Sequence, residues 1–406
     1  MKLRGKSYSV TGPVRTANED LVQIDDQRQI YLLADGMGGH VGGAKASQLS
    51  VETVANILGD SFDPDAQASS VQDIDRWEKY LRDAISSASQ VVHKLAKEDS
   101  KLHGMGSTLT TLVHRDGNGI LGHVGDSRLY LYRGGVLHQL THDHTITAQL
   151  LAEGRISPAE VNSHRYRNVL TKAVGVYEGV EADTLVFELA LGDHLLMCSD
   201  GFYDLFDDHD ALLKFVSDNI KADFVPALEK IIEERQASDN VSVVFLDVVP
   251  DDKNAEAETS HSQEVVLKVE ILKEVNLFQQ LDMKDVVALV QSGFVHRLEA
   301  GADIVLEGEN PASSLYVILE GEVEILKGGA RIAKLKKGNH FGEMSLLLDA
   351  PRSASVKALT DLSLIELPKT VIEQFLQRTP RGGIEFLLAM SREFAERLSE
   401  ANKRTE

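Results

Sequence analysis

Short apolar runs dominate the chain up to about residue 249, and two longer stretches between them follow the helical period. The apolar runs predict strands and lie at Ile30 to Leu33, Leu109 to Val113, Leu129 to Tyr132, Leu185 to Leu189 and Leu195 to Cys198. The helical period covers Ala44 to Leu58 and Asp73 to Lys97. Because the strands come in hairpin-like groups, the pattern favours an α+β fold with antiparallel, layered sheets over a doubly wound parallel sheet.

The hydrophobic pattern breaks once, directly after the strand-like run that ends at Val249. From Pro250 the sequence is polar and acidic, and a helical pattern resumes around Val265. A polar gap between two periodic segments is typical of a linker, and 406 residues exceed the usual size of one hydrophobic core. We therefore predict a first domain at 1–249, an acidic polar linker at 250–264 and a second domain at 265–406.

The second domain begins with a helical stretch, Val269 to Leu281, and continues with short strand-like runs separated by glycine residues. Short strands with regular turns predict a β-roll or jelly-roll barrel with flanking helices. A long amphipathic run, Ile384 to Leu398, closes the chain. Its apolar face is compatible with packing on its own β-roll and equally with a dimer seam, so the oligomeric state stays open.

Composition and charge restrict the partners and the compartment. Hydrophobic residues make up 43% and charged residues 26%, as in folded proteins, and the formal net charge of −21 repels phosphate backbones and anionic lipids. We therefore expect no nucleic-acid and no membrane partner. The single cysteine, Cys198, allows no intrachain disulfide, the first residues lack the apolar core of a signal peptide, and no run approaches the roughly 18 apolar residues of a membrane span. These features predict a cytoplasmic protein.

Acidic residues stand where predicted strands give way to turns. They occur in four places, at Glu19-Asp20, Asp35-Gly36, Asp200-Gly201 and Asp239-Asn240. An ordinary β-turn explains any one of them. Four together are harder to explain in this way, because carboxylates that converge at one end of a sheet repel one another unless a cation lies between them. Oxygen ligands without thiolates suit Mg²⁺ or Mn²⁺ rather than Zn²⁺, and the 14 histidines show no H-E-x-x-H spacing.

The ordered set of motifs resembles the metal-dependent protein phosphatase family, also called PPM or type 2C, over nearly all of residues 5–249. Besides the acidic clusters, the resemblance includes Gly106-Ser107-Thr108, Gly125-Asp126-Ser127-Arg128, Leu140 to His144 and Arg167 to Gly175. It implies an α-β-β-α layered sandwich. It also implies a serine/threonine protein phosphatase in which two metal ions activate a water that hydrolyses the phosphomonoester of phosphoserine or phosphothreonine proteins.

The resemblance also assigns metal ligands. Asp35 would bridge two Mn²⁺ or Mg²⁺ ions, with the Gly36 carbonyl as a further ligand. Asp200 and Asp239 would hold one of these ions, and Glu19 would help to hold the other, partly through water.

Further roles follow from the same resemblance. Asp20 would support Glu19, Asp126 matches the position of a third, weaker metal in bacterial members, and Arg15 would bind the substrate phosphate through its planar guanidinium. Many members carry a histidine, a suggested general acid, two residues after the bridging aspartate, where this chain has Met37. The nearest histidine is His40, so either His40 or a metal-bound water is expected to supply the proton.

The segment from Asp143 to Val176 resembles the flap beside the active site in this family. We expect Asp143 to cap a helix from Thr145 to Glu153 that Gly154 ends. Cys198 is expected to be a buried strand residue rather than a nucleophile, because the C-x5-R loop of cysteine phosphatases would require an arginine where this chain has Asp204.

Residues Phe341 to Val356 of the second domain resemble the phosphate-binding cassette of cyclic-nucleotide-binding domains. The alternative interpretation of this segment is a turn and an apolar helix with a solvated arginine. The resemblance implies instead that Glu343 would accept the ribose 2′-hydroxyl and that Arg352 would pair with the cyclic phosphate. Backbone amides after Gly342 would complete the site. Ser353 suits either purine, and cAMP is the expected ligand over cGMP.

The two halves together predict a metal-dependent phosphatase that a cyclic nucleotide regulates. The alternative is a cyclic-nucleotide sensor or scaffold whose phosphatase half is weak or inactive. A third interpretation combines an active phosphatase with a purely structural β-roll. The presence of Arg15, Asp35 and Asp200 argues against an inactive phosphatase half. The presence of Glu343 and Arg352 argues against a purely structural β-roll.

Overall fold

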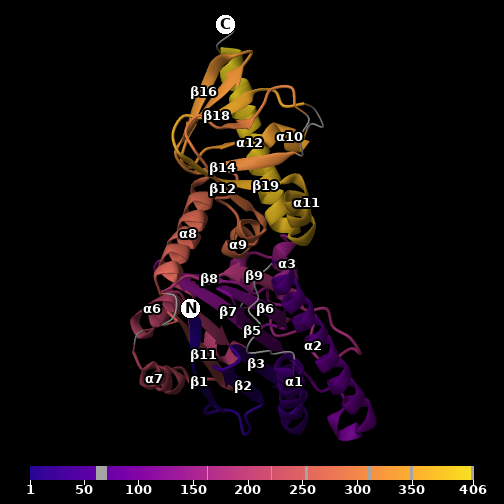
Figure 1. The fold of residues 1–406 in the computed structure, drawn as a ribbon. Coiled ribbons are helices and arrows are strands. Elements are labelled where there is room, and N and C mark those ends of the chain that lie inside the picture. Colours follow the sequence, from indigo (N-terminus) through magenta and orange to yellow (C-terminus); the bar gives the residue numbers. More distant parts are fainter. Residues whose placement is uncertain are drawn as a thin grey trace. The chain divides into compact units, whose positions relative to one another are not determined.

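Figure 1 shows the computed structural model of the chain, which describes residues 1–60, 71–161, 163–220, 222–251, 255–309, 313–347 and 351–403. The chain divides into two compact units, Met1–Ser260 and His261–Glu406. Each unit is described by itself. None of the helices in these ranges is both long enough and apolar enough to cross a bilayer.

Two antiparallel sheets form the centre of the first unit. The first has the order β1-β11-β10-β7-β8 and the second β2-β3-β5-β6-β9, with β4 paired to β3. The strands are β1 (Lys2–Val10), β2 (Asp20–Asp25), β3 (Ile30–Met37), β4 (Gly106–Ser107), β5 (Leu109–Arg115), β6 (Asn118–Val124), β7 (Arg128–Arg133), β8 (Val136–Gln139), β9 (Asp183–Glu188), β10 (His194–Cys198) and β11 (Val241–Val249).

Helices cover the outer face of each sheet (Figure 1). Alternate residues of a strand point to opposite faces, so Leu32 and Ala34 pack against α1 (His40–Asp60) and α2 (Val71–Glu98). The sheets pack on each other through β1, β2, β3 and β11, which gives the α-β-β-α layers expected from the sequence. The first sheet is covered by α5 (Asp200–Tyr203), α6 (His209–Asn219) and α7 (Val225–Arg235); the short elements η1 (Ser100–Leu102), α3 (Ile146–Ala152) and α4 (Pro158–Val161) lie in connections.

The second unit contains two four-stranded antiparallel sheets whose inner faces share one core that includes Ile318, Val323 and Leu364. Their orders are β12-β19-β14-β17 and β13-β18-β15-β16. This is the predicted β-roll. Helix α8 (Ala255–Glu274) contains the limit between the two units. The other elements are α9 (Met283–Ser292), β12 (Phe294–Leu298), β13 (Asp303–Val305), β14 (Ser314–Glu320), β15 (Glu322–Lys327), β16 (Ala330–Lys336), β17 (His340–Phe341), α10 (Glu343–Leu347), β18 (Ser355–Ala358), β19 (Leu362–Pro368), α11 (Lys369–Arg378) and α12 (Pro380–Lys403).

The limits of one helix differ clearly from those expected. Helix α8 starts at Ala255, inside the segment expected to be a polar linker, and ends at Glu274 rather than continuing to Leu281. Good helix formers and the first-turn acids Glu256 and Glu258 explain the early start, since acidic groups near a helix N-terminus interact favourably with its dipole. The domain limits at 249 and 265 stay predictions.

Candidate active site

The β2–β3 ladder places two of the predicted acidic residues opposite each other. Asp20 and Asp35 are direct partners in its register. The backbone of Asp35 is fixed from the neighbouring strand, because its N–H donates to Thr108 Oγ1 (2.9 Å) and its carbonyl accepts from Thr108 N (2.8 Å) and Ser107 Oγ (2.9 Å). Gly36 follows in a confined position, where a Cβ atom would lie 2.1 Å from Gly43 O. The chain therefore needs glycine at 36.

The other sheet brings Asp200 and Asp239 to the same neighbourhood. Asp200 lies just after β10 and Asp239 just before β11, which are antiparallel partners. The pKa of Asp35 is raised well above its ordinary value by burial and then by the charges of Asp20, Asp200, Asp126 and Asp239. Five segments of the chain therefore bring acidic groups to one neighbourhood, and four of these segments are the strand-end clusters noted in the sequence.

Repulsion and burial also raise the pKa values of the neighbouring carboxyl groups. Burial, followed by the charge of Asp239, raises the pKa of Asp200 to about 7. Burial also raises the pKa of Asp20 to about 6, although a hydrogen bond from Ser199 opposes this shift. The pKa of Asp126 is raised by burial and then by Asp200. Such a cluster is stable in its ionised form only with added positive charge.

Two oxygen atoms of this cluster accept no hydrogen bond from the described part of the chain. They are Asp20 Oδ1 and Asp200 Oδ1, and both atoms are buried. Within the described ranges, no three acidic, histidine or cysteine side chains form a closed group that would hold one metal ion. The predicted acidic residues thus lie near one another, but no three of these side chains surround one metal position. Backbone oxygen atoms or water would supply part of the coordination shell of a bound ion.

Arg15 extends from the loop before β2 to the edge of the cluster. Its Nη2 lies 2.5 Å from Asp239 Oδ2, and its Nε donates to Ser238 O (3.3 Å). The side chain is 44% exposed, which leaves the guanidinium accessible to a ligand from solution. His40 opens α1, but its side chain lies outside the described part of the structure.

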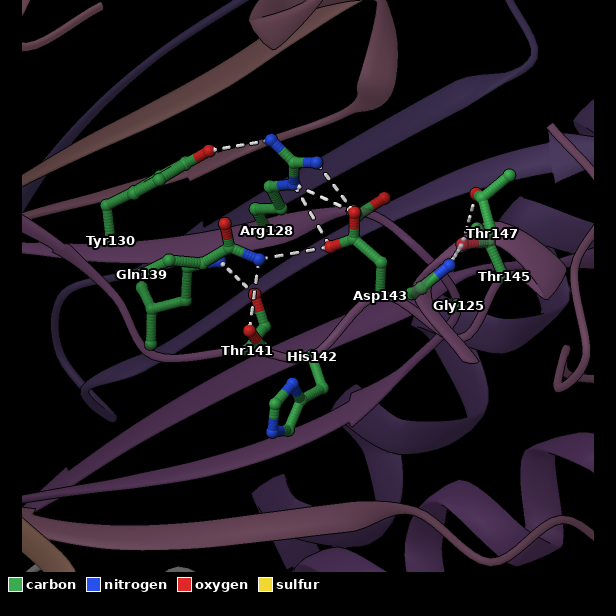
Figure 2. Close-up of polar contacts among 12 residues, drawn as sticks. Gly125, Arg128, Tyr130, Gln139, Thr141, His142, Asp143, Thr145 and Thr147 are labelled. Carbon is green, nitrogen blue, oxygen red and sulfur yellow. Dashed lines mark hydrogen bonds and ion pairs between the residues drawn. The ribbon is translucent and has the colours of Figure 1, made fainter. Parts of the chain in front are cut away.

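Near Asp126, an ion pair corrects one sequence expectation. Asp143 does not cap α3; Thr145 does, accepting from Ala148 N at 3.1 Å. Figure 2 shows that Asp143 instead pairs with Arg128, whose Nε and Nη2 lie 3.0 and 2.6 Å from its two oxygens. An aspartate just before a helix can cap that helix or form an ion pair. Here it forms the ion pair, because the guanidinium of Arg128 on β7 lies beside it.

The same arginine reaches other elements, and its role was missed from the sequence. Arg128 Nη1 donates to Tyr130 OH at 3.0 Å (Figure 2). Its Cζ lies 3.6 Å from the ring centroid of Tyr203, a residue of α5 close to Asp200. Ser199 was missed as well: its hydroxyl donates to Asp20 Oδ2 (2.9 Å). The only sequence signal was a small hydroxyl residue beside a predicted metal ligand.

Cys198 is fully buried, as predicted.

The predicted nucleotide-site residues gather around α10 in the second unit. Arg352 and Glu343 are buried, and Arg352 Nη1 donates to Ser345 Oγ (2.7 Å). Ser345 Oγ donates in turn to the carbonyl of Gly342, directly before α10 (2.8 Å). Ser353 is exposed. A buried, fixed guanidinium beside a helix start can bind an anion.

Two known families match different parts of the chain. Residues 10–233 match the protein phosphatase 2C family, and residues 295–379 match the cyclic nucleotide-binding domain. Protein phosphatase PhpP of Streptococcus pneumoniae is 32% identical over 244 residues, which cover 59% of this chain and 96% of PhpP. Serine/threonine phosphatase stp of Listeria monocytogenes is 35% identical over 197 residues, which cover 48% of this chain and 75% of stp.

Solved structures give the same assignment. The serine/threonine phosphatase PstP/Ppp of Mycobacterium tuberculosis aligns at a TM-score of 0.55 and 33% identity, over 62% of this chain and 100% of that one. A catalytic domain of PstP in complex with two manganese ions aligns at 0.53 and 33%, over 61% and 99%. The chain thus belongs to the protein phosphatase 2C family and carries a cyclic nucleotide-binding domain after its phosphatase fold.

Proposed function

We propose that this protein is a metal-dependent serine/threonine protein phosphatase that hydrolyses phosphoserine and phosphothreonine in proteins. The main supporting observation is the meeting of Asp20, Asp35, Asp200 and Asp239 from two sheets, with Arg15 beside Asp239. A lone buried thiol, Cys198, supports a cytoplasmic site of action, since thiols stay reduced there.

The residues of the cluster fit divalent cations. Asp20 and Asp200 each have a buried oxygen that accepts no hydrogen bond from the described residues, and the neighbouring carboxyl groups repel one another. An all-oxygen donor set suits Mn²⁺ or Mg²⁺. Asp35, which lies among the other carboxyl groups, would help to hold the ions. The proposed ligands are Glu19, Asp35, the Gly36 carbonyl, Asp200 and Asp239, with Asp20 in support and Asp126 for a third, weaker ion.

When bound, the ions would supply positive charge and a water of lowered pKa beside the phosphoryl group. The side chains of the protein position the substrate. Arg15 would bind two phosphate oxygens at once, because its guanidinium offers two parallel N–H donors and stays charged. Its exposed position is suited to a phosphate carried on another protein. His40 or a water molecule would protonate the leaving serine or threonine oxygen.

The experiment is Mn²⁺-dependent hydrolysis of a phosphothreonine peptide by the full chain, with Asp200→Ala as the test variant. The matched control is Asp207→Ala, an exposed aspartate that pairs with Arg235 at the surface. We expect wild type and Asp207→Ala to be active only with Mn²⁺ or Mg²⁺, and Asp200→Ala to lose at least about a hundredfold in kcat/KM, since it removes charge next to the reacting centre. A folded wild-type protein without metal-dependent activity would overturn the proposal in favour of the scaffold alternative.

We also propose that a cyclic nucleotide, cAMP before cGMP, binds the second unit and changes the phosphatase rate. Supporting observations are the burial of Glu343 and Arg352 beside α10 and the covalent link between the two units. Regulation requires that the nucleotide binds one state of the protein more tightly than another, with a coupling of about 1–3 kcal/mol.

Binding and coupling are tested separately. Isothermal titration of the full chain with cAMP and with cGMP measures affinity, and Arg352→Ala should abolish it. Phosphatase assays at saturating nucleotide then measure coupling. Binding without any change of kcat or KM would refute the regulation and leave the nucleotide site intact. Absence of binding would refute both.

A further inference from the structure

Asn240 lies between the acidic residues of one sheet and the loop that carries Arg15. This residue is 4% exposed. The amide oxygen Oδ1 accepts from Glu19 N at 2.8 Å, and Nδ2 donates to Thr11 O and Ala17 O, both at 2.9 Å. One side chain thus binds the loop of residues 11–19 at three backbone atoms.

The three partners specify an amide in one orientation. A backbone N–H faces one end of the side chain and two carbonyls face the other, so one acceptor and two donors are required together. Only an amide group supplies both on a short stem; an aspartate has no donors, and serine has one. Leaving these partly buried backbone groups unpaired is unfavourable.

The loop bears functional groups but has little regular structure of its own, since residues 11–19 contain neither helix nor strand. Thr11 and Ala17 lie on either side of Arg15 in the sequence, and Glu19 ends the loop. The two Nδ2 bonds therefore fix the backbone on both sides of Arg15, while the Oδ1 bond fixes Glu19.

The backbone of Asn240 extends these contacts to the other acidic residues. Its N–H donates to Asp239 Oδ1 (2.8 Å). Its carbonyl oxygen lies 2.0 Å from the position that a Cβ atom would take on Gly201, directly after Asp200, so the two segments are in close contact there. Asn240 therefore touches Glu19, Asp239 and the residue after Asp200, but it is too deeply buried to meet a protein substrate.

We propose that Asn240 is a positioning residue. The two ends of its side-chain amide separately hold the two functional groups of the loop, Arg15 and Glu19, in place. The Nδ2 end sets the position of Arg15 and so the affinity for the substrate phosphate, and the Oδ1 end sets Glu19 and so the affinity for metal. The inference rests on the proposed phosphatase activity.

The test compares Asn240→Ala with Asn240→Asp in the full chain. Asn240→Ala loses both ends of the amide, so KM for a phosphothreonine peptide and the Mn²⁺ concentration for half-maximal activity should each rise about tenfold, with kcat at saturation changing less. Asn240→Asp keeps the acceptor for Glu19 N and adds negative charge, so KM should rise without an increased Mn²⁺ requirement. Asn219→Ala is the matched control, because Asn219 Nδ2 donates to Phe215 O at the end of α6, on an element that carries none of the proposed ligands.

A double-mutant cycle with Arg15→Ala separates positioning from a loss of stability. If Asn240 acts through Arg15, Asn240→Ala should raise KM far less in the Arg15→Ala background than in wild type. Full additivity, or a KM and Mn²⁺ requirement of Asn240→Ala equal to those of wild type, would overturn the inference. An inactive wild-type protein would instead refute the proposed function, so the two failures are distinguishable.

Discussion

The hydroxyl of Ser199 donates a hydrogen bond of 2.9 Å to Asp20 Oδ2 and joins the two sheets of the phosphatase fold. Ser199 follows β10 in one sheet, and Asp20 begins β2 in the other. Ser199 Oγ also accepts from Ser242 N at 3.1 Å, so the hydroxyl has a defined orientation. This bond opposes the rise in the pKa of Asp20 that burial causes, and it favours the ionised carboxylate.

We predict that Ser199→Ala destabilises the first unit by about 1–2 kcal/mol, because it removes the hydroxyl partner of a buried carboxylate and of a buried N–H. The concentration of Mn²⁺ for half-maximal activity should rise several-fold, because Asp20 becomes easier to protonate. Urea unfolding and metal titration of the phosphatase activity measure the two effects. Ser217→Ala removes a hydroxyl that donates to Lys214 O on the exposed side of α6 and should change neither. An unchanged Mn²⁺ requirement in Ser199→Ala would contradict the role given to this bond.

The Arg128–Asp143 pair predicts that lysine cannot replace Arg128. Lysine provides one point charge, whereas the guanidinium forms two parallel bonds to Asp143 and one to Tyr130 (Figure 2). The guanidinium also lies over the ring of Tyr203. We expect Arg128→Lys to lower the free energy of unfolding by about 1–2 kcal/mol, since the pair is mostly buried. The control is Arg235→Lys, which alters a similarly bidentate but exposed pair with Asp207 and should leave the melting temperature unchanged. Equal melting temperatures for all three proteins would show that lysine can replace Arg128 and that the geometry of the guanidinium contributes nothing to stability.

The fold class and the main acidic residues could be predicted because their signals are local. Short continuous apolar runs such as Leu195 to Cys198 predict buried strands, and an acidic residue after such a run lies at the end of the strand. The motif order then predicted that Asp35 and Asp200 would meet, and the structure brings their charges together.

Other contacts depend on tertiary partners that no local pattern reveals. The sequence around Asp143 fits a helix cap, but Arg128 from β7 competes for the carboxylate, and Thr145 can supply the cap instead. Likewise, nothing near Asn240 indicates that its amide faces Thr11 and Ala17, because that contact crosses more than two hundred residues of chain. Polar contacts of this kind are fixed by topology and burial rather than by periodicity.

Cys198 should be unreactive in the folded protein. The side chain is fully buried in the core under α5 to α7, and burial raises the pKa of its thiol, so the nucleophilic thiolate is scarce near neutral pH. We expect no alkylation by iodoacetamide at about pH 8 in native buffer and full alkylation in urea, as measured by mass spectrometry, with phosphatase activity retained after native treatment. Rapid native alkylation would contradict the packing of β10.

Asp285 gives the second unit a stability that depends on pH. This α9 residue is only 4% exposed, and burial, followed by the charge of Asp282, raises its pKa to about 6; Lys284 and Lys273 oppose this shift. A raised carboxyl pKa means that the folded unit keeps a proton that the unfolded chain has released. Stability should therefore fall as the pH rises from about 4 to about 6 and then depend no further on this group.

Asp285→Asn removes this titration while keeping the shape of the side chain. The free energy of unfolding of Asp285→Asn, minus that of wild type, should increase by about 2 kcal/mol from about pH 4 to about pH 6.5. Urea unfolding of the full chain at several pH values measures this difference. The comparison between variants cancels the titration of the acidic cluster in the first unit, which both proteins share. Asp303→Asn, at an exposed position of β13, should give a difference that does not vary with pH. A constant difference for Asp285→Asn as well would mean that Asp285 is ionised in the folded unit throughout this range, with Lys284 and Lys273 outweighing its burial.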